Sequence, residues 1–102
     1  MSSTTKTLEK ILGFSADYAS ERLGELTPRE TEIAGKFADG LDARHIGAEL
    51  GISPKTVDIH RGNIKIKLGV KSTVNIVRVV LLRRLVDALS KEAGRKAKSK
   101  GR

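Results

Sequence analysis

Apolar residues recur every three or four positions along most of this chain, which is the spacing of one face of an α-helix. Glycines interrupt the pattern at several points, because glycine readily ends a helix in a left-handed turn. The pattern predicts an all-α fold whose helices cover residues 7–12, 15–23, 26–40, 42–50, 53–69 and 72–89.

The helix expected over residues 53–69 has the most sharply defined ends. Ser53 is a good N-cap, and Pro54 follows at the first helical position, where its missing N–H does no harm. Ile52 can contact Val57 across the helix start, as in a hydrophobic staple. Gly69 is placed to end the helix.

One face of this helix is a narrow apolar stripe formed by Val57, Ile64 and Leu68. Such a stripe suits a helix that is half buried and half offered to a partner. The opposite face mixes charged, polar and small residues with one isolated apolar residue: Lys55, Asp58, Ile59, Gly62, Asn63 and Lys65.

Two further helix starts precede this one. Thr27 is an N-cap, and Glu30 completes a capping box with it. Asp42 caps the next helix, which a Leu-Gly-Ile-Ser turn separates from the helix over 53–69. Two short capped helices joined in this way form a helix-turn-helix pattern, whose second helix enters the major groove of DNA.

The helix over residues 72–89 carries more apolar surface than one small core can cover. Its core face is expected to be Val74, Val77, Leu81, Leu85 and Leu89, while Ile76, Val79, Val80 and Val86 wrap around a second side. That second side suggests a surface for self-association. The alternative is that the short helices before residue 26 cover this second side. Their sequence fits an accessory arm and padding of the core equally well.

The positive charge is concentrated in the second half of the chain. Of the formal net charge of +8, residues 1–50 contribute −3 and residues 51–102 contribute +11. Residues 90–102 are almost all Lys, Arg, Gly, Ser and Ala, which predicts a disordered basic tail. A strongly basic half that contains the helix-turn-helix favours nucleic acid as the partner over an acidic membrane surface.

The remaining composition excludes several other functions. The chain has no cysteine, and its most apolar run is interrupted by Arg78, so we expect a soluble, cytoplasmic protein with no membrane partner. His45 and His60 are the only histidines and lie on different expected helices. With no paired carboxylates beside them and no phosphate-binding glycine loop, we expect no catalytic residues, no metal site and no cofactor.

Residues 26–89 resemble the LuxR/GerE-type DNA-binding domain. The resemblance is carried by Leu-Thr-Pro-Arg-Glu at 26–30, Leu-Gly-Ile-Ser at 50–53, Thr-Val at 56–57, Asn-Ile at 63–64 and Lys-Leu-Gly-Val at 67–70. The segment over 56–64 looks most like the FixJ branch of response regulators. Residues 1–25 are too short for the receiver domain of such regulators, so the chain is either a small stand-alone regulator or part of a longer protein.

The resemblance implies a four-helix domain over residues 26–89, preceded by an arm over 1–25 and followed by the tail over 90–102. It assigns base reading to Asp58, Ile59 and Gly62. It assigns phosphate contacts to Lys55, Thr56, His60, Asn63, Lys65, Lys67, Lys71 and Ser72. Dimerisation falls on the last helix, at Val77, Val80, Leu81 and Leu85. One departure from the family is Gly47, where alanine is usual.

The resulting prediction is a sequence-specific regulator of transcription that binds double-stranded DNA as a homodimer, with RNA polymerase as a further partner. Two alternatives remain open at this point. One is a promoter-binding domain like the fourth region of a sigma factor, which also begins with Leu-Thr-x-Arg-Glu. The other is an interaction module that forms a heterodimer with a full-length regulator.

Overall fold

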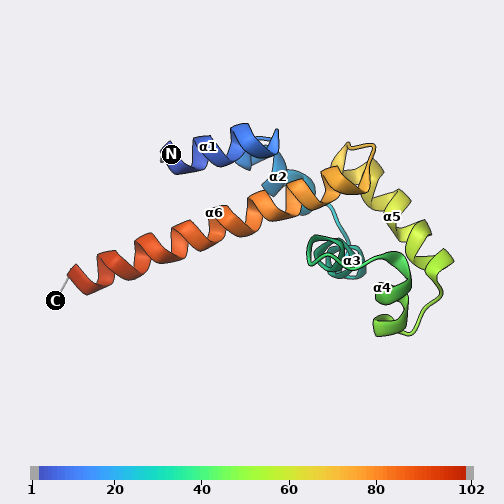
Figure 1. Ribbon diagram of the computed structural model, residues 1–102. Helices are drawn as coiled ribbons and strands as arrows, with labels where there is room; N and C mark the ends of the chain where they lie inside the picture. The colour runs from blue at the N-terminus through green and yellow to red at the C-terminus, as the bar shows by residue number, and fades with distance from the viewer. Residues whose placement is uncertain (1–2, 101–102) are drawn as a thin grey trace.

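A computed structural model of the protein describes residues 3–100, with side chains described as far as Gly94. The described residues form helices joined by short loops, without strands (Figure 1). The helices are α1 (Ser3–Leu12), α2 (Ala16–Leu23), α3 (Pro28–Ala38), α4 (Ala43–Leu50), α5 (Pro54–Leu68) and α6 (Thr73–Lys100). The prediction of an all-α fold is confirmed.

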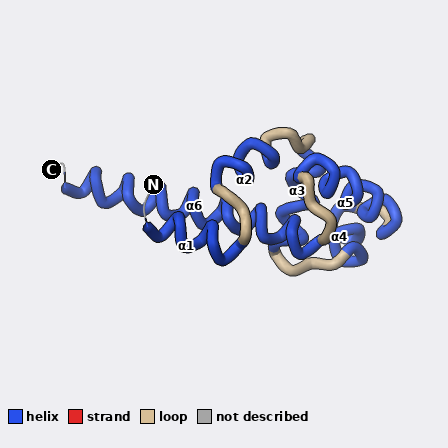
Figure 2. The backbone as a smooth tube through the Cα atoms, turned by 90° about the horizontal axis from the view of Figure 1, so that it is seen from above, coloured by secondary structure: helices blue, strands red, loops and turns tan. Residues whose placement is uncertain are grey.

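The long helix α6 is the element against which most of the others pack. Figure 2 shows α1 and α2 beside α6, while α3, α4 and α5 gather around its N-terminal end. The core between them is almost wholly aliphatic, as expected for a chain with 3% aromatic residues. Its largest fully buried side chains are Ile33, Ile46, Val57, Ile64, Leu68, Ile76, Val79 and Leu82.

The helix starts follow the local sequence signals. Thr27 and Glu30 form the expected capping box at α3, since each side chain accepts from the other residue's backbone N–H. Asp42 accepts from the His45 N–H at the start of α4, and Ser53 accepts from the Thr56 N–H at the start of α5. These caps satisfy donors that have no partner inside the helix, so they fix where each helix begins.

Both ends of the chain contain more helix than the sequence pattern predicted. Helix α1 begins at Ser3 rather than at residue 7, and α6 continues to Lys100, past the expected helix end at residue 89. Lys, Arg, Glu and Ala are good helix formers, and Gly94 is the one glycine in this extension. Residues 101–102, the end of the tail expected to be disordered, lie outside the described residues, as do residues 1–2.

The assignment of faces on α6 was wrong. Ile76 and Val79, expected on the second side, are fully buried, whereas Val74 and Leu85, expected in the core, are 59% and 41% exposed. The reason is that α1 and α2 pack along α6 and bring Ala19 and other apolar residues onto the side that seemed uncovered. The arm therefore pads the core, as the alternative interpretation held.

Candidate nucleic-acid interface

Helices α4 and α5 form a closely joined pair. Helix α4 ends at Gly51 in the left-handed conformation (φ 70°), and the Ile52 N–H donates to the Gly47 carbonyl oxygen at 3.0 Å. Helix α5 starts at Pro54, three residues after Gly51 and directly after the Ser53 cap. Lys36 of α3 donates to Glu49 of α4 at 2.6 Å, which braces the pair from behind. That contact also raises the pKa of Lys36.

Helix α5 is buried on one side and open on the other, as its pattern predicted. Val57, Ile64 and Leu68 are fully buried, and Lys55, Asp58 and Asn63 are exposed on other faces. A short row of the exposed face contains the predicted base-reading positions Ile59 and Gly62. Ile59 is 60% exposed, and a Cβ on Gly62 would have no neighbouring atom within 4 Å.

Ile66 also belongs to this exposed row, and the sequence prediction missed it. Its side chain is 77% exposed, and it lies seven residues after Ile59, which places both on one side of α5. That spacing was the signal that could have found it. Two exposed isoleucines on one helix face are apolar groups that a partner can cover.

Asp58 is held by an arginine from the next turn of α5. Arg61 donates from Nη2 to Asp58 Oδ1, and its Nη1 lies 3.4 Å from Thr73 Oγ1 of α6. Its guanidinium carbon also lies 5.4 Å from the centroid of the Phe37 ring in α3. Arg61 is therefore turned toward the rear of α5, and Oδ2 of Asp58 is the oxygen left to accept from a ligand.

The residues assigned to phosphate contacts divide into two groups. Lys55, Asn63 and Lys71 are exposed, and His60 and Lys65 are half-buried. The other three have partners inside the protein. Thr56 Oγ1 lies 2.9 Å from Ser53 Oγ, Ser72 Oγ accepts from the Asn75 N–H at 3.1 Å, and Lys67 Nζ lies 2.7 Å from Glu30 Oε1.

The pair between Lys67 and Glu30 ties α5 to α3 through a buried carboxylate. Glu30 is 5% exposed. Burial by itself raises the pKa of Glu30, but hydrogen bonds from Lys67 and from the Thr27 backbone, with the nearby ammonium charge, outweigh it and leave the pKa below its ordinary value. The carboxylate is therefore ionised at neutral pH, and Lys67 is its counter-ion.

The residues assigned to dimerisation do not share one environment. Val77 and Leu81 are half-buried, and Leu85 is 41% exposed. Val80, by contrast, is 8% exposed and packs inside the protomer. Val74 and Leu89 extend the open face at either end, so an apolar row runs along α6 from Val74 to Leu89.

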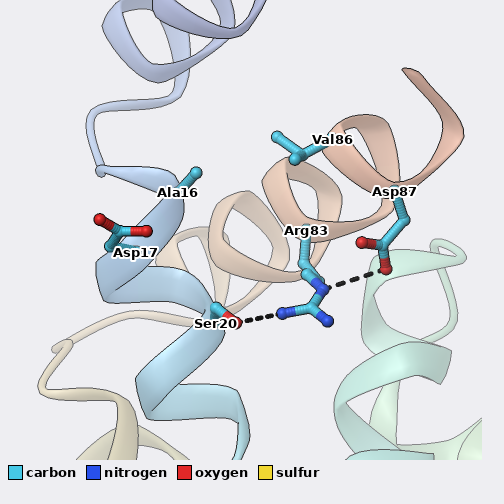
Figure 3. Close-up of a pocket in the computed structure, with 6 residues that line it drawn as sticks. All are labelled: Ala16, Asp17, Ser20, Arg83, Val86 and Asp87. Atoms are coloured by element: carbon cyan, nitrogen blue, oxygen red, sulfur yellow. Dashed lines mark hydrogen bonds and ion pairs between the residues drawn. The ribbon is translucent and has the colours of Figure 1, made fainter. Parts of the chain in front are cut away.

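A concavity away from α4 and α5 lies between α2 and α6 (Figure 3). It is lined by Ala16, Asp17, Ser20, Arg83, Val86 and Asp87, and none of these residues belongs to α4 or α5. Arg83 crosses it and donates to Ser20 and to Asp87. Arg83 is thus already paired within the protein, with Ser20 and Asp87.

Other kinds of site find little support in residues 3–94. No group of three or more His, Asp or Glu side chains there is placed to hold a metal ion. His45 contacts its own helix cap, Asp42, whose pKa is lowered first by the His45 backbone N–H and then by the ring. Within the same described part of the chain, no helix combines the length and apolar content of a membrane span.

Two short helices joined by a tight turn, with the second exposed on one side in a strongly basic half of the chain, define a helix-turn-helix DNA-binding domain. Residues 24–80 match the sequence profile of the family described as "Bacterial regulatory proteins, luxR family". The chain belongs to this luxR family of bacterial regulatory proteins, and its domain is that of DNA-binding transcription regulators rather than of an enzyme class.

Curated relatives are similar over the same region. Transcriptional regulatory protein UhpA of Escherichia coli strain K12 is 50% identical over 60 residues, which are 59% of this chain and 31% of UhpA. Transcriptional regulatory protein FixJ of Rhizobium meliloti is 38% identical over 60 residues, 59% of this chain and 29% of FixJ. The match thus covers under a third of each relative's length. No solved structure gives a significant match.

Proposed function

We propose that the protein binds double-stranded DNA sequence-specifically as a homodimer and thereby regulates transcription, with α5 in the major groove. The observation that carries the proposal is the division of α5 into a fully buried side and an open side. The open side is rigid because the Ser53 cap, the Gly69 ending and the buried stripe fix the helix. A rigid, half-exposed helix is what reading base edges requires.

The base-reading roles fall to Asp58, Ile59 and Gly62. Asp58 accepts from a cytosine amino group through Oδ2, since Oδ1 is bonded to Arg61. Ile59 packs on a thymine methyl group, and the open space at Gly62 lets the helix backbone approach the bases. To these we add Ile66, because it lies in the same exposed row as Ile59.

Phosphate contacts in this proposal come from the groups around that row. Lys55 and Lys71 are exposed and lie near the two ends of α5, and His60, Asn63 and Lys65 lie between them. Thr56, Lys67 and Ser72 stay in the set, but their present partners mean that they contribute only by shifting toward the DNA. Contacts of this kind set affinity and orientation, while the base contacts set specificity.

The homodimer forms through the open row on α6, with Val77, Leu81 and Leu85 at its centre. A second copy is the occupant that fits, because duplex operators are commonly two-fold symmetric and a dimer doubles the phosphate contacts. Val80 supports this surface from inside the protomer. RNA polymerase is a further partner, reached once the regulator is placed on a promoter.

Selection from random duplexes tests the base-reading assignment. Wild type is expected to enrich a defined sequence, and Asp58→Ala is expected to lose preference at one base pair per half-site, because a lost base contact costs about 1–3 kcal/mol of discrimination. Its dependence on salt should stay the same. The measurement is sequencing of the bound pool together with affinity at several salt concentrations.

Lys55→Ala is the matched control for that experiment. Loss of a phosphate contact weakens binding to all sequences alike and reduces the slope of log affinity against log salt by about 1. If wild type enriches no sequence at any salt concentration, the proposed function is wrong. If Asp58→Ala behaves like Lys55→Ala, Asp58 does not read a base.

Leu85→Asp is expected to weaken self-association by at least about tenfold, since a charge would enter the centre of an apolar interface. Leu85 is already 41% exposed, so the change leaves the protomer's core intact. Sedimentation of the full chain over a range of concentrations measures the effect. Ser90→Asp is the matched control, because it adds the same charge at an exposed position on another face of α6. A wild-type protein that stays monomeric with and without DNA contradicts the homodimer.

A further inference from the structure

Helix α2 reaches across the molecule to the C-terminal end of α5. The Tyr18 hydroxyl donates a hydrogen bond to the Leu68 carbonyl oxygen at 2.6 Å, joining residues 50 positions apart. Figure 1 shows α2 lying beside α6 near the point where α5 ends. Residues 1–23 lie outside the segment that matches the family profile, so this contact comes from the part of the chain that the family match leaves without a role.

The Tyr18 ring is held in place from several sides. It stacks on Phe14 with the ring centroids 5.8 Å apart, and the Arg22 guanidinium lies over it at 5.1 Å from its centroid. The next residue, Ala19, is fully buried in the core. The hydroxyl is therefore presented at a fixed position, and the entropy lost on forming the bond is small.

The group that accepts this bond is one that α5 cannot satisfy alone. The last carbonyl groups of a helix have no donor within the helix, and Leu68 is the final residue of α5. Gly69 adopts the left-handed conformation (φ 70°), and its N–H and that of Val70 close the helix on Ile66 and Lys65. A Cβ at Gly69 would lie 2.6 Å from the Tyr18 hydroxyl oxygen, so the contact is also tight.

Helix α4 provides an internal comparison within the same domain. It ends at Gly51 with the same φ of 70°, but its closing bond, from Ile52 to Gly47, involves no residue of the arm. Both helices thus end in the same local turn, and the tyrosine contact distinguishes the end of α5.

We propose that Tyr18 is a positioning residue for DNA binding: by bonding to the Leu68 carbonyl, it fixes the end of α5 and with it residues 69–72. That segment carries Lys71 and Ser72, which the proposed function assigns to phosphate contacts, so the inference rests on that function. Helix α2 is accordingly part of the DNA-binding unit. Tyr18 acts through α5 and touches no DNA itself.

The first test needs no DNA. Tyr18→Phe in the full chain keeps the ring and removes the hydroxyl. Exchange of the Gly69 and Val70 amide hydrogens is expected to become about fivefold faster, the effect of losing one hydrogen bond, while the Ile52 amide is unchanged. Unchanged exchange at Gly69 and Val70 overturns the proposal. Equal acceleration at Ile52 also overturns it, because Tyr18 would then stabilise the whole fold.

The second test uses the duplex that wild type selects. Tyr18→Phe is expected to bind it about fivefold more weakly, with the same base preference and a shallower salt dependence, because a phosphate contact is loosened. Ser20→Ala is the matched control: it removes the contact of α2 with Arg83 and leaves α5 untouched, so its affinity should equal wild type. Unchanged affinity in Tyr18→Phe, or an equal loss in Ser20→Ala, overturns the positioning role.

The two tests separate this inference from the proposed function. If wild type binds no duplex, the proposed function fails, yet the exchange rates of Gly69 and Val70 still show whether Tyr18 secures the end of α5. If wild type binds and only the exchange changes, the contact is structural and the positioning role is wrong.

Discussion

Glu30→Ala is expected to lower the free energy of unfolding by about 2 kcal/mol, because one side chain makes two kinds of contact. Glu30 accepts from the Thr27 N–H at 2.9 Å in the capping box and from Lys67 Nζ at 2.7 Å. Removing it leaves a partly buried ammonium without a counter-ion. The Lys67 side chain is 35% exposed and can turn toward water, so the loss is smaller than for a fully buried pair.

Two other substitutions calibrate this expectation. Glu30→Gln keeps an oxygen for the Thr27 N–H but loses the charge, so about half of the loss should remain. Glu32→Ala removes an exposed carboxylate whose partner, Arg29, is also exposed, and should change stability by less than about 0.5 kcal/mol. Urea unfolding at pH 7 measures all three. Equal stabilities of Glu30→Ala and Glu32→Ala would contradict the importance of this pair.

The lowered pKa of Glu30 also makes the stability of the protein depend on pH. Its pKa in the folded protein lies below the ordinary value of 4.5, so its contribution is complete above pH 4.5 and disappears as the pH falls through the folded pKa. The pKa of Asp42 is also lowered, so protonation of Asp42 adds to the stability that wild type loses in acid. The difference between wild type and Glu30→Gln, followed by unfolding at several pH values, should therefore shrink below pH 4.5. A constant difference would exclude the lowered pKa.

Gly47→Ala is expected to destabilise the protein by about 1–2 kcal/mol, although alanine is the better helix former. A Cβ at Gly47 would lie 2.5 Å from the Ile52 carbonyl oxygen and 3.4 Å from Pro54 N, and both are backbone atoms. The turn between α4 and α5 would have to move, and α5 would move with it. DNA affinity should consequently fall even at temperatures where the variant is fully folded.

Gly62→Ala is the natural control, because the same substitution meets no atom within 4 Å at that position. It should raise stability by about 0.5–1 kcal/mol through helix propensity alone. Thermal unfolding of the two variants should therefore shift in opposite directions. If both variants become more stable, the turn has room for a Cβ and the close approach at Gly47 has no consequence. The short distance from a Cβ at Gly47 to the Ile52 carbonyl oxygen also gives a reason for glycine at position 47, where the LuxR family usually has alanine.

Local signals predicted the helices well, because a cap depends on residues only a few positions apart. Thr27, Asp42 and Ser53 could each be assigned from their neighbours. The faces of α6 could not, because both sides of that helix are apolar and periodicity does not say which one meets the arm. For this reason Ile76, which is buried, was expected on the second side, and Leu85, which is exposed, was expected in the core.

For the candidate site, too, local features were predicted from the sequence and long-range contacts were not. The exposure of Asp58 and Ile59 followed from the spacing of the buried stripe on α5. The contacts of Lys67 with Glu30 and of Tyr18 with Leu68 join residues 37 and 50 positions apart. No local pattern encodes such pairs, so these two contacts could be identified only in three dimensions.

The contacts of the arm also set an order for assembly of the fold. Tyr18 bonds to Leu68 and Ser20 to Arg83, partners 50 and 63 positions further along the chain. During synthesis, α1 and α2 emerge before α5 and α6, and they have no surface to dock on until those later helices exist. Helices α3, α4 and α5 are near neighbours in sequence and can associate earlier, since short loops close with a smaller loss of entropy. Helices α1 and α2 are thus made before the helices that hold them in place, and nascent chains halted before residue 83 should carry them undocked.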